Sequence, residues 1–129
     1  MNMAHHFNKH YTLEEARALL PQIREWLASI SVLRVRIEQY DKAGEGHLAS
    51  GCDAGGDDVN RWITAVAELK QVLTEFQSRE IQIKDMERGL IDFPAIIAGK
   101  EVFLCWEKAE DDIEYWHDLD SGYTGREAL

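Results

Sequence analysis

The chain of 129 residues is about as long as one domain, and 45% of its residues are hydrophobic, so it can bury a modest core. Its formal net charge is −10, and its Lys and Arg residues are scattered among acids. This argues against duplex nucleic acid or an anionic membrane as a partner, because both require a clustered positive surface. The two cysteines, Cys52 and Cys105, are too few for a disulfide framework, and we expect both to be reduced thiols. No apolar run has the length of a signal peptide or a membrane span, which predicts a cytoplasmic protein.

The first residues, 1–11, precede the first predicted helix and contain three histidines, His5, His6 and His10. Imidazoles can capture a stray divalent metal, but the ends of a chain are usually poorly ordered. We therefore predict a mobile leader whose side chains are solvated.

A first helix is predicted over residues 12–42. Thr12 and Glu15 have the spacing of a capping box, in which each side chain satisfies a backbone N–H that the first turn leaves free. Pro21 lacks an N–H and its ring crowds the preceding turn, so we expect a kink or a short first helix near Leu20. The alternative is a second helix that begins at Pro21. Apolar residues recur at alternating spacings of three and four, the heptad seam of a coiled coil: Ala16, Leu19, Ile23, Trp26, Ile30, Leu33, Ile37 and Tyr40.

Residues 43–56 hold five of the nine glycines and predict a flexible loop. His47 and Cys52 in this loop are metal-ligand residue types, but the four-ligand spacing of a zinc site is absent. A second helix is predicted over residues 57–80, and its seam has the same periodicity as the first. Two matched seams joined by one loop predict an antiparallel helical hairpin. The second seam consists of Val59, Trp62, Val66, Leu69, Leu73 and Phe76.

The apolar faces of the two helices are wider than a hairpin alone can cover. Ile63 and Val72 extend the second helix's apolar face beyond its seam, so the C-terminal part or a second copy must cover them. Trp26 and Trp62 fit core or interface anchors better than an aromatic binding platform. At about 1.5 Å per residue the first helix spans roughly 45 Å, which is long for so small a domain. We therefore expect a homodimer, with another protein as a further potential partner.

Residues 81–129 are predicted to be rich in strands, because their apolar residues alternate with a period of two. Pro94 cannot donate a ladder hydrogen bond, so its strand should lie at an edge or break near its middle. The elements together predict one domain over residues 1–129 of the α+β class. In it, a small antiparallel meander of three or four strands packs on the helical hairpin. Its predicted strands run from Ile81 to Lys84, Leu90 to Ile97, Glu101 to Glu107 and Ile113 to Leu119, separated by turns.

Four motifs of the chain carry a family resemblance: YTLEEARALLPQIRE, RGLIDFPA, EVFLCWE and YWHDLDSGYTGR. In this order they resemble the bacterial family known as domain of unknown function 2203, over nearly the whole chain apart from the glycine-rich loop. The resemblance implies one small cytoplasmic domain. It implies no role for any residue, because the family is biochemically uncharacterised.

Asp92, Glu107 and His117 are the candidate site residues of the C-terminal part. Residues two apart share a strand face, so Cys105 and Glu107 should lie on one face, and pairing around the acidic turn should place His117 opposite about Phe103. If the two carboxylates and the imidazole converge, they form a site for manganese, zinc, nickel or iron that could activate water.

A structural role is the alternative for these residues. Arg88 and Arg126 would then neutralise the two acids, and His117 would hydrogen-bond a backbone carbonyl. Arg126 could otherwise orient an anionic substrate beside a metal. Cys105 has no adjacent base in the sequence, which predicts a buried thiol with a raised pKa rather than a nucleophile.

Two functions follow from these patterns. The first is a non-enzymatic interaction or scaffold protein that self-associates through its helical hairpin. The second is a divalent-metal-binding protein or a small metal-dependent enzyme that uses the carboxylate and histidine cluster. The heptad seams favour the first function, because heptads specify association more often than catalysis.

Overall fold

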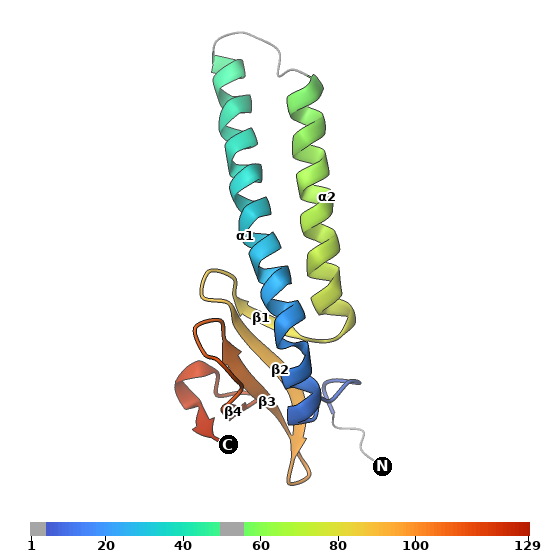
Figure 1. Ribbon diagram of the computed structural model, residues 1–129, viewed down its shortest axis with the longest axis vertical. Helices are drawn as coiled ribbons and strands as arrows, with labels where there is room; N and C mark the ends of the chain where they lie inside the picture. Colours follow the sequence, from blue (N-terminus) through green and yellow to red (C-terminus); the bar gives the residue numbers. More distant parts are fainter. Residues whose placement is uncertain (1–4, 50–55) are drawn as a thin grey trace.

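The computed structural model describes residues 5–49 and 56–129 as a helical hairpin that stands on a small sheet (Figure 1). Within these residues, five strands form one antiparallel sheet in chain order. The predicted α+β class and the helical hairpin are confirmed, although the meander has more strands than expected. The elements are α1 (Leu13–Ala49), α2 (Gly56–Ser78), β1 (Gln82–Asp85), β2 (Leu90–Ile97), β3 (Lys100–Glu107), β4 (Tyr115–Asp118), the 3-10 helix η1 (Tyr123–Gly125) and β5 (Glu127–Ala128).

The predicted capping box begins α1. The backbone N–H of Thr12 donates to Glu15 Oε1 at 2.9 Å, and the N–H of Glu15 donates to Thr12 Oγ1 at 3.1 Å. The backbone hydrogen bond from Thr12 is the main reason that the pKa of Glu15 lies below its ordinary value. α1 then continues through Pro21, so the helix neither ends near Leu20 nor begins again at Pro21. Pro21 is exposed and its neighbours Leu20 and Ile23 are buried, so their packing offsets the lost backbone hydrogen bond.

The end of α1 lies beyond the predicted end at residue 42. α1 runs to Ala49, so the first half of the predicted loop over residues 43–56 is helical, and α2 already begins at Gly56. Glycine inside a helix costs only about 1 kcal/mol relative to alanine, and the alanine, glutamate and leucine of this stretch favour helix. The predictions for the His47 side chain and for Cys52 lie outside what the structure describes.

The core lies between α1, the end of α2 and one face of the sheet. α1 buries a wider stripe than the predicted seam, because Leu20 and Leu27 are buried beside Ile23 and Ile30. This width follows from the position of α1, which packs against α2 and against the sheet.

Most seam residues are therefore buried or half-buried within one copy of the chain, and few remain on a surface that a second copy could cover. At the distal end of the hairpin, Val59 and Trp62 remain exposed. Of the other predicted seam and interface residues, Ile23, Ile30, Leu33 and Phe76 are buried, and Trp26, Ile37, Val66, Leu69 and Leu73 are half-buried.

Pro94 lies within β2, and the strand does not break there. β2 is also not an edge strand along its whole length. β1 pairs with β2 only as far as Asp92, so β2 has an open side at Pro94. The leader takes this side, because the backbone N–H of Tyr11 donates to the Pro94 carbonyl at 2.7 Å. β2 is thus an edge only locally, where the missing N–H of Pro94 breaks no ladder bond.

The part of the leader that the structure describes, residues 5–11, is held against the sheet and corrects the prediction of a mobile segment. Glu101 of β3 accepts hydrogen bonds from the backbone N–H groups of His6 at 2.8 Å and Phe7 at 3.1 Å. Glu80 accepts the next two backbone N–H groups. The ring of Phe7 packs edge-on against Phe103, with the centroids 5.4 Å apart. Phe7 and Glu101 are 94 residues apart in the chain, so no local sequence pattern indicates this contact.

Candidate functional site

The two faces of the sheet have different neighbours. One face packs against the helices through apolar side chains such as Phe93. The other face carries Asp92 of β2, Cys105 of β3 and His117 of β4, because side chains alternate along a strand. Asp92 pairs directly with Cys105. His117 pairs with Phe103, which confirms the predicted position of His117. The register therefore brings three chemically active side chains together across three neighbouring strands.

His117 and Asp92 form an enclosed acid–base pair, with side chains 2% and 3% exposed. His117 Nε2 lies 3.0 Å from Asp92 Oδ2, and Nδ1 lies 2.7 Å from the backbone carbonyl of Asp118. A carbonyl oxygen only accepts, so Nδ1 carries a hydrogen, and Nε2 and the carboxylate must share one further proton. Burial raises the pKa of Asp92, and the charge and hydrogen bond of His117 partly oppose that rise.

Cys105 is the third member of this cluster and is fully buried. One ligand atom each of Asp92, Cys105 and His117 lies within 4.8 Å of the others. Burial, reinforced by the carboxylate of Asp92, raises the pKa of Cys105 to about 12. Cys105 is a free cysteine and remains a protonated thiol at neutral pH, as the sequence predicts.

The leader is connected to the cluster through the ring of Phe103. The ring of Phe103 lies 5.5 Å from the ring of His117, measured between centroids. Phe7 packs on the same Phe103 ring, so the leader, β3 and β4 make one continuous contact. The ring beside His117 is therefore itself in contact with a segment more than a hundred residues from His117 in the sequence.

Glu107 does not join the cluster. It lies at the end of β3, where its Oε2 pairs with Arg88 at 2.6 Å. Arg126 pairs with Glu110 rather than with either predicted acid, and its guanidinium lies 3.8 Å from the centroid of the Tyr115 ring. Both arginines are thus engaged in ion pairs beside the cluster, and neither contacts Asp92.

The structure brings together two of the three predicted ligands, and Cys105 stands where Glu107 was expected. The signal that could have distinguished them is the turn at residues 98–99. A two-residue turn that pairs Ile97 with Lys100 also pairs Asp92 with Cys105 when the register is counted back along both strands. Ala98 and Gly99 have positive φ angles of 51° and 78°, as such a turn requires.

The cluster has the donor set of a buried cation site. A carboxylate oxygen, an imidazole nitrogen and a cysteine sulfur together suit zinc and related metals. His117 Nδ1 is hydrogen-bonded to a backbone carbonyl. In metal-binding histidines the ring nitrogen that does not bind the metal usually makes such a bond, which fixes the orientation of the ring. Asp92 Oδ1 is buried without a hydrogen-bond partner among the described residues. All three side chains are buried, so the cluster could enclose an ion but presents no surface to a substrate.

A family model described as uncharacterized conserved protein (DUF2203) matches residues 9–129, which include both helices and the whole sheet. The chain belongs to the DUF2203 family. The resemblance carried by the four motifs is thus confirmed. No curated protein and no solved structure gives a significant match to this DUF2203 chain. Among its described helices, none combines the length and the apolarity that crossing a membrane requires.

Proposed function

We propose that this DUF2203 protein is a non-enzymatic interaction protein that forms a homodimer through the distal part of its helical hairpin. The observation that carries the proposal is the apolar surface exposed where α1 and α2 extend beyond the sheet (Figure 1). Val32 and Val35 of α1 are both 51% exposed, and the consecutive residues Trp62 and Ile63 of α2 are 38% and 52% exposed. Large apolar side chains concentrated on one projecting element favour an interaction surface.

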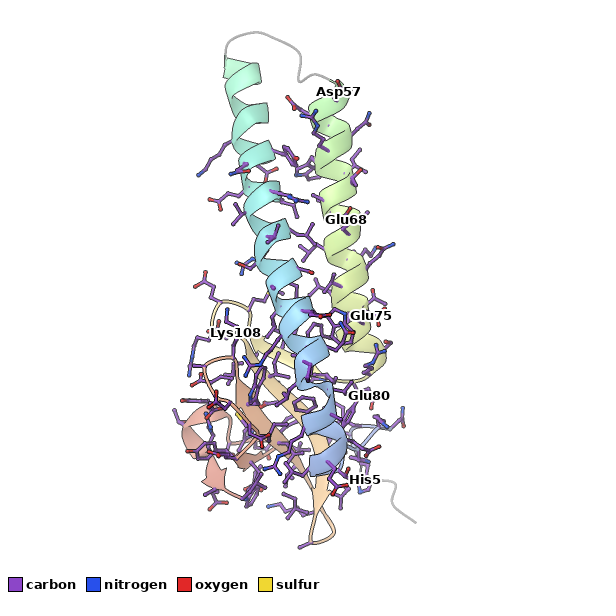
Figure 2. The ribbon with its side chains drawn as sticks, viewed as in Figure 1. His5, Asp57, Glu68, Glu75, Glu80 and Lys108 are labelled. Atoms are coloured by element: carbon purple, nitrogen blue, oxygen red, sulfur yellow. The ribbon has the colours of Figure 1, made fainter. Side chains whose placement is uncertain are left out.

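A groove between the two helices supports a second copy of the chain as the partner. Val32 and Arg36 line it from α1, and Val72 and Glu68 line it from α2. Figure 2 labels Glu68 midway along α2. Arg36 and Glu68 make no salt bridge with any residue that the structure describes. The groove, of about 460 Å³, therefore combines an apolar floor of Val32, Leu33 and Val72, beside the polar Ser29 and Gln71, with a positive charge on the α1 side and a negative charge on the α2 side.

A two-fold axis parallel to the hairpin would match these charges. It would place α1 of each copy against α2 of the other. Arg36 of each copy would then face Glu68 of the other, and the two Val32 side chains would be covered between them. A self-complementary surface of this kind favours an identical partner over one with a single sign of charge.

The position of the buried cluster also supports a non-enzymatic role. A catalytic group must reach its substrate, and the side chains of Asp92 and His117 are 3% and 2% exposed. The exposed surface of the hairpin lies away from this cluster, on the part of the helices beyond the sheet (Figure 1).

Charge reversal tests the dimer directly. Arg36→Glu and Glu68→Arg should each weaken self-association about tenfold or more in sedimentation equilibrium, because each places like charges opposite one another. The double variant Arg36→Glu/Glu68→Arg should restore most of the affinity. Ile96→Lys is the matched control, because Ile96 is an exposed apolar residue at the end of β2 and should leave association unchanged.

Val32→Asp adds an independent test of the apolar floor. Val32 is exposed in the monomer, so the substitution should abolish dimers without unfolding the chain, as checked by circular dichroism. A wild-type protein that stays monomeric at high concentration would contradict the proposal. So would a double charge reversal that associates no better than the single variants.

As a second candidate function, we propose that the cluster of Asp92, Cys105 and His117 holds a divalent transition metal. The support is the partnerless Asp92 Oδ1 beside two further potential ligands. Metal analysis of tag-free protein by mass spectrometry should find near one equivalent, lost in His117→Ala and Asp92→Ala. Glu107→Ala should keep the metal, because Glu107 pairs with Arg88 instead. A metal-free wild type, or equal loss in Glu107→Ala, would refute this candidate.

A further inference from the structure

A second group of potential metal ligands lies outside this cluster, where the leader meets the start of β3. His5, His10 and Glu101 each offer one ligand atom within 4.8 Å of the others. His10 Nε2 lies 2.7 Å from Glu101 Oε2, and the rings of His5 and His10 meet edge-on with their centroids 4.8 Å apart. The side chains of His10 and Glu101 are 20% and 7% exposed and His5 is half-buried, so the two histidines are the part of the group that is open to solvent. Figure 2 labels His5 at the sheet end of the molecule, opposite the tip of the hairpin.

We propose that His5, His10 and Glu101 form a divalent transition-metal site that fastens the leader to the sheet. Two imidazoles and one carboxylate are a donor set that zinc, nickel, cobalt and iron all accept. Three protein ligands would leave further coordination positions for water, as half-buried ligands at a surface allow.

Glu101 is positioned for this role before any ion binds. Its two oxygens accept the backbone N–H groups of His6 and Phe7 at 2.8 and 3.1 Å, which fixes the plane of the carboxylate. With His10 Nε2 at Oε2 as the third partner, one of about four lone-pair directions remains on Oε1, and an ion at Oε2 would take the place of the His10 hydrogen. Burial alone would raise the pKa of Glu101, but hydrogen bonds from His10 and from the two backbone N–H groups lower it to about 2. The carboxylate is therefore anionic over the whole neutral range.

The histidines are positioned by the backbone of the leader. The N–H groups of Asn8 and Lys9 donate to Glu80 Oε2 at 2.8 and 2.7 Å, between the two histidines in the chain. Tyr11 continues this attachment through its backbone N–H to Pro94 and its hydroxyl to the Arg79 carbonyl. An ion would meet ligands that are already ordered, so little conformational entropy opposes its binding.

The simplest competing explanation is a hydrogen-bonded lock between His10 and Glu101 that needs no metal. His5 separates the two explanations, because it contacts the ring of His10 but makes no hydrogen bond to Glu101 among the described residues. His5→Ala removes one proposed ligand and leaves the lock intact. His6→Ala is the matched control, since the neighbouring His6 ring is not part of the group.

The experiment is a calorimetric titration of tag-free, metal-free protein with Zn²⁺. The wild type and His6→Ala should bind with the same affinity, and His5→Ala and His10→Ala should bind about tenfold or more weakly. Zn²⁺ should raise the melting temperature of the wild type and of His6→Ala more than that of His5→Ala. Without Zn²⁺, His5→Ala should melt with the wild type, since the lock is unchanged.

Cobalt distinguishes this group from the cluster that contains Cys105. Co²⁺ bound by His5, His10 and Glu101 should show visible ligand-field bands without the near-ultraviolet charge-transfer band that a thiolate ligand produces. A wild type that does not bind Zn²⁺, or a His5→Ala variant that binds as tightly as His6→Ala, would overturn the proposal. A thiolate band that is lost in Cys105→Ser, with no further visible band that His5→Ala removes, would also overturn it, by assigning all of the bound cobalt to the buried cluster.

Discussion

Replacing His117 with alanine isolates the cost of burying the Asp92 carboxylate. Oδ2 of Asp92 is hydrogen-bonded to His117, and Oδ1 has no partner among the described residues. In His117→Ala Oδ2 also loses its partner, so burial raises the pKa of Asp92 further above its ordinary value, opposed only by the Cys105 thiol and the charge of Lys84. An unpartnered buried polar group costs about 1–3 kcal/mol. Truncation of a large buried side chain adds about 2–5 kcal/mol, so the variant should lose a large share of a stability of about 5–15 kcal/mol.

The pH dependence identifies Asp92 as the source of this cost. His117→Ala is compared with the double variant Asp92→Asn/His117→Ala, because both lack the imidazole and only one has the carboxyl group. A raised pKa in the folded state means that the folded chain binds the extra proton more tightly than the unfolded chain. Protonated Asp92 makes its full contribution to the free energy of unfolding below the unfolded pKa of about 3.9. This contribution is lost as the pH rises through the folded pKa. The single variant should therefore lose ~1.4 kcal/mol per pH unit relative to the double variant across that window.

Urea unfolding from about pH 4, near the unfolded pKa, to pH 8 measures this difference, at one fixed protein concentration because association also stabilises the folded chain. The gap in unfolding free energy between the two variants should widen with pH and then stay constant above the folded pKa. A gap that does not change over this range would refute the reasoning, because it would mean that the Asp92 carboxylate is ionised without penalty.

Two further predictions concern single side chains and turns. In a Cys52→Ser background, Cys105 should resist thiol reagents until the protein is denatured, because it is buried and its pKa is raised to about 12. Rapid labelling of Cys105 in the folded protein would contradict this prediction. Gly89→Ala should destabilise the protein by about 2–4 kcal/mol in urea unfolding, because Gly89 has a φ of 66° and an added Cβ would lie 2.8 Å from Cβ of Lys108. Gly99→Ala is its control, with a φ of 78° and nothing within 4 Å, and should carry only the backbone cost of about 1–2 kcal/mol. Equal losses in the two glycine variants would show that the overlap at Gly89 is relieved.

The features that could be predicted from the sequence are those that depend on neighbours in the chain. The capping box of Thr12 and Glu15 satisfies N–H groups three residues apart, and it forms as expected. The change of period from three and four to two marks the boundary between α2 and β1, because side-chain direction follows the local backbone. The pairing of Phe103 with His117 also forms as expected, whereas the turn after Ile97 is one residue shorter than predicted, because Lys100 already belongs to β3.

The features that could not be predicted depend on distant neighbours. Leu20 and Leu27 are buried because the sheet lies against α1, and the seam alone gives no sign of that second contact. Pro94 is accommodated inside β2 because Tyr11 of the leader occupies its open side. The leader itself is held by Glu80 and Glu101, whose partners are separated from them by 71 to 95 residues.

The face of β3 that points away from the helices contacts the leader and carries residues of both candidate metal sites. Glu101, Phe103, Cys105 and Glu107 alternate along this strand, so all four side chains lie on the face away from the helices. Glu101 and Phe103 both meet the leader, and Phe103 also meets His117 of β4. Cys105 meets the paired strand at Asp92, and Glu107 meets the turn at Arg88. The alternation is visible in the sequence, but the partners are not, because they come from other parts of the chain. An ion bound between the leader and Glu101 would therefore stabilise the segment whose Phe7 packs against Phe103, the ring that also contacts His117.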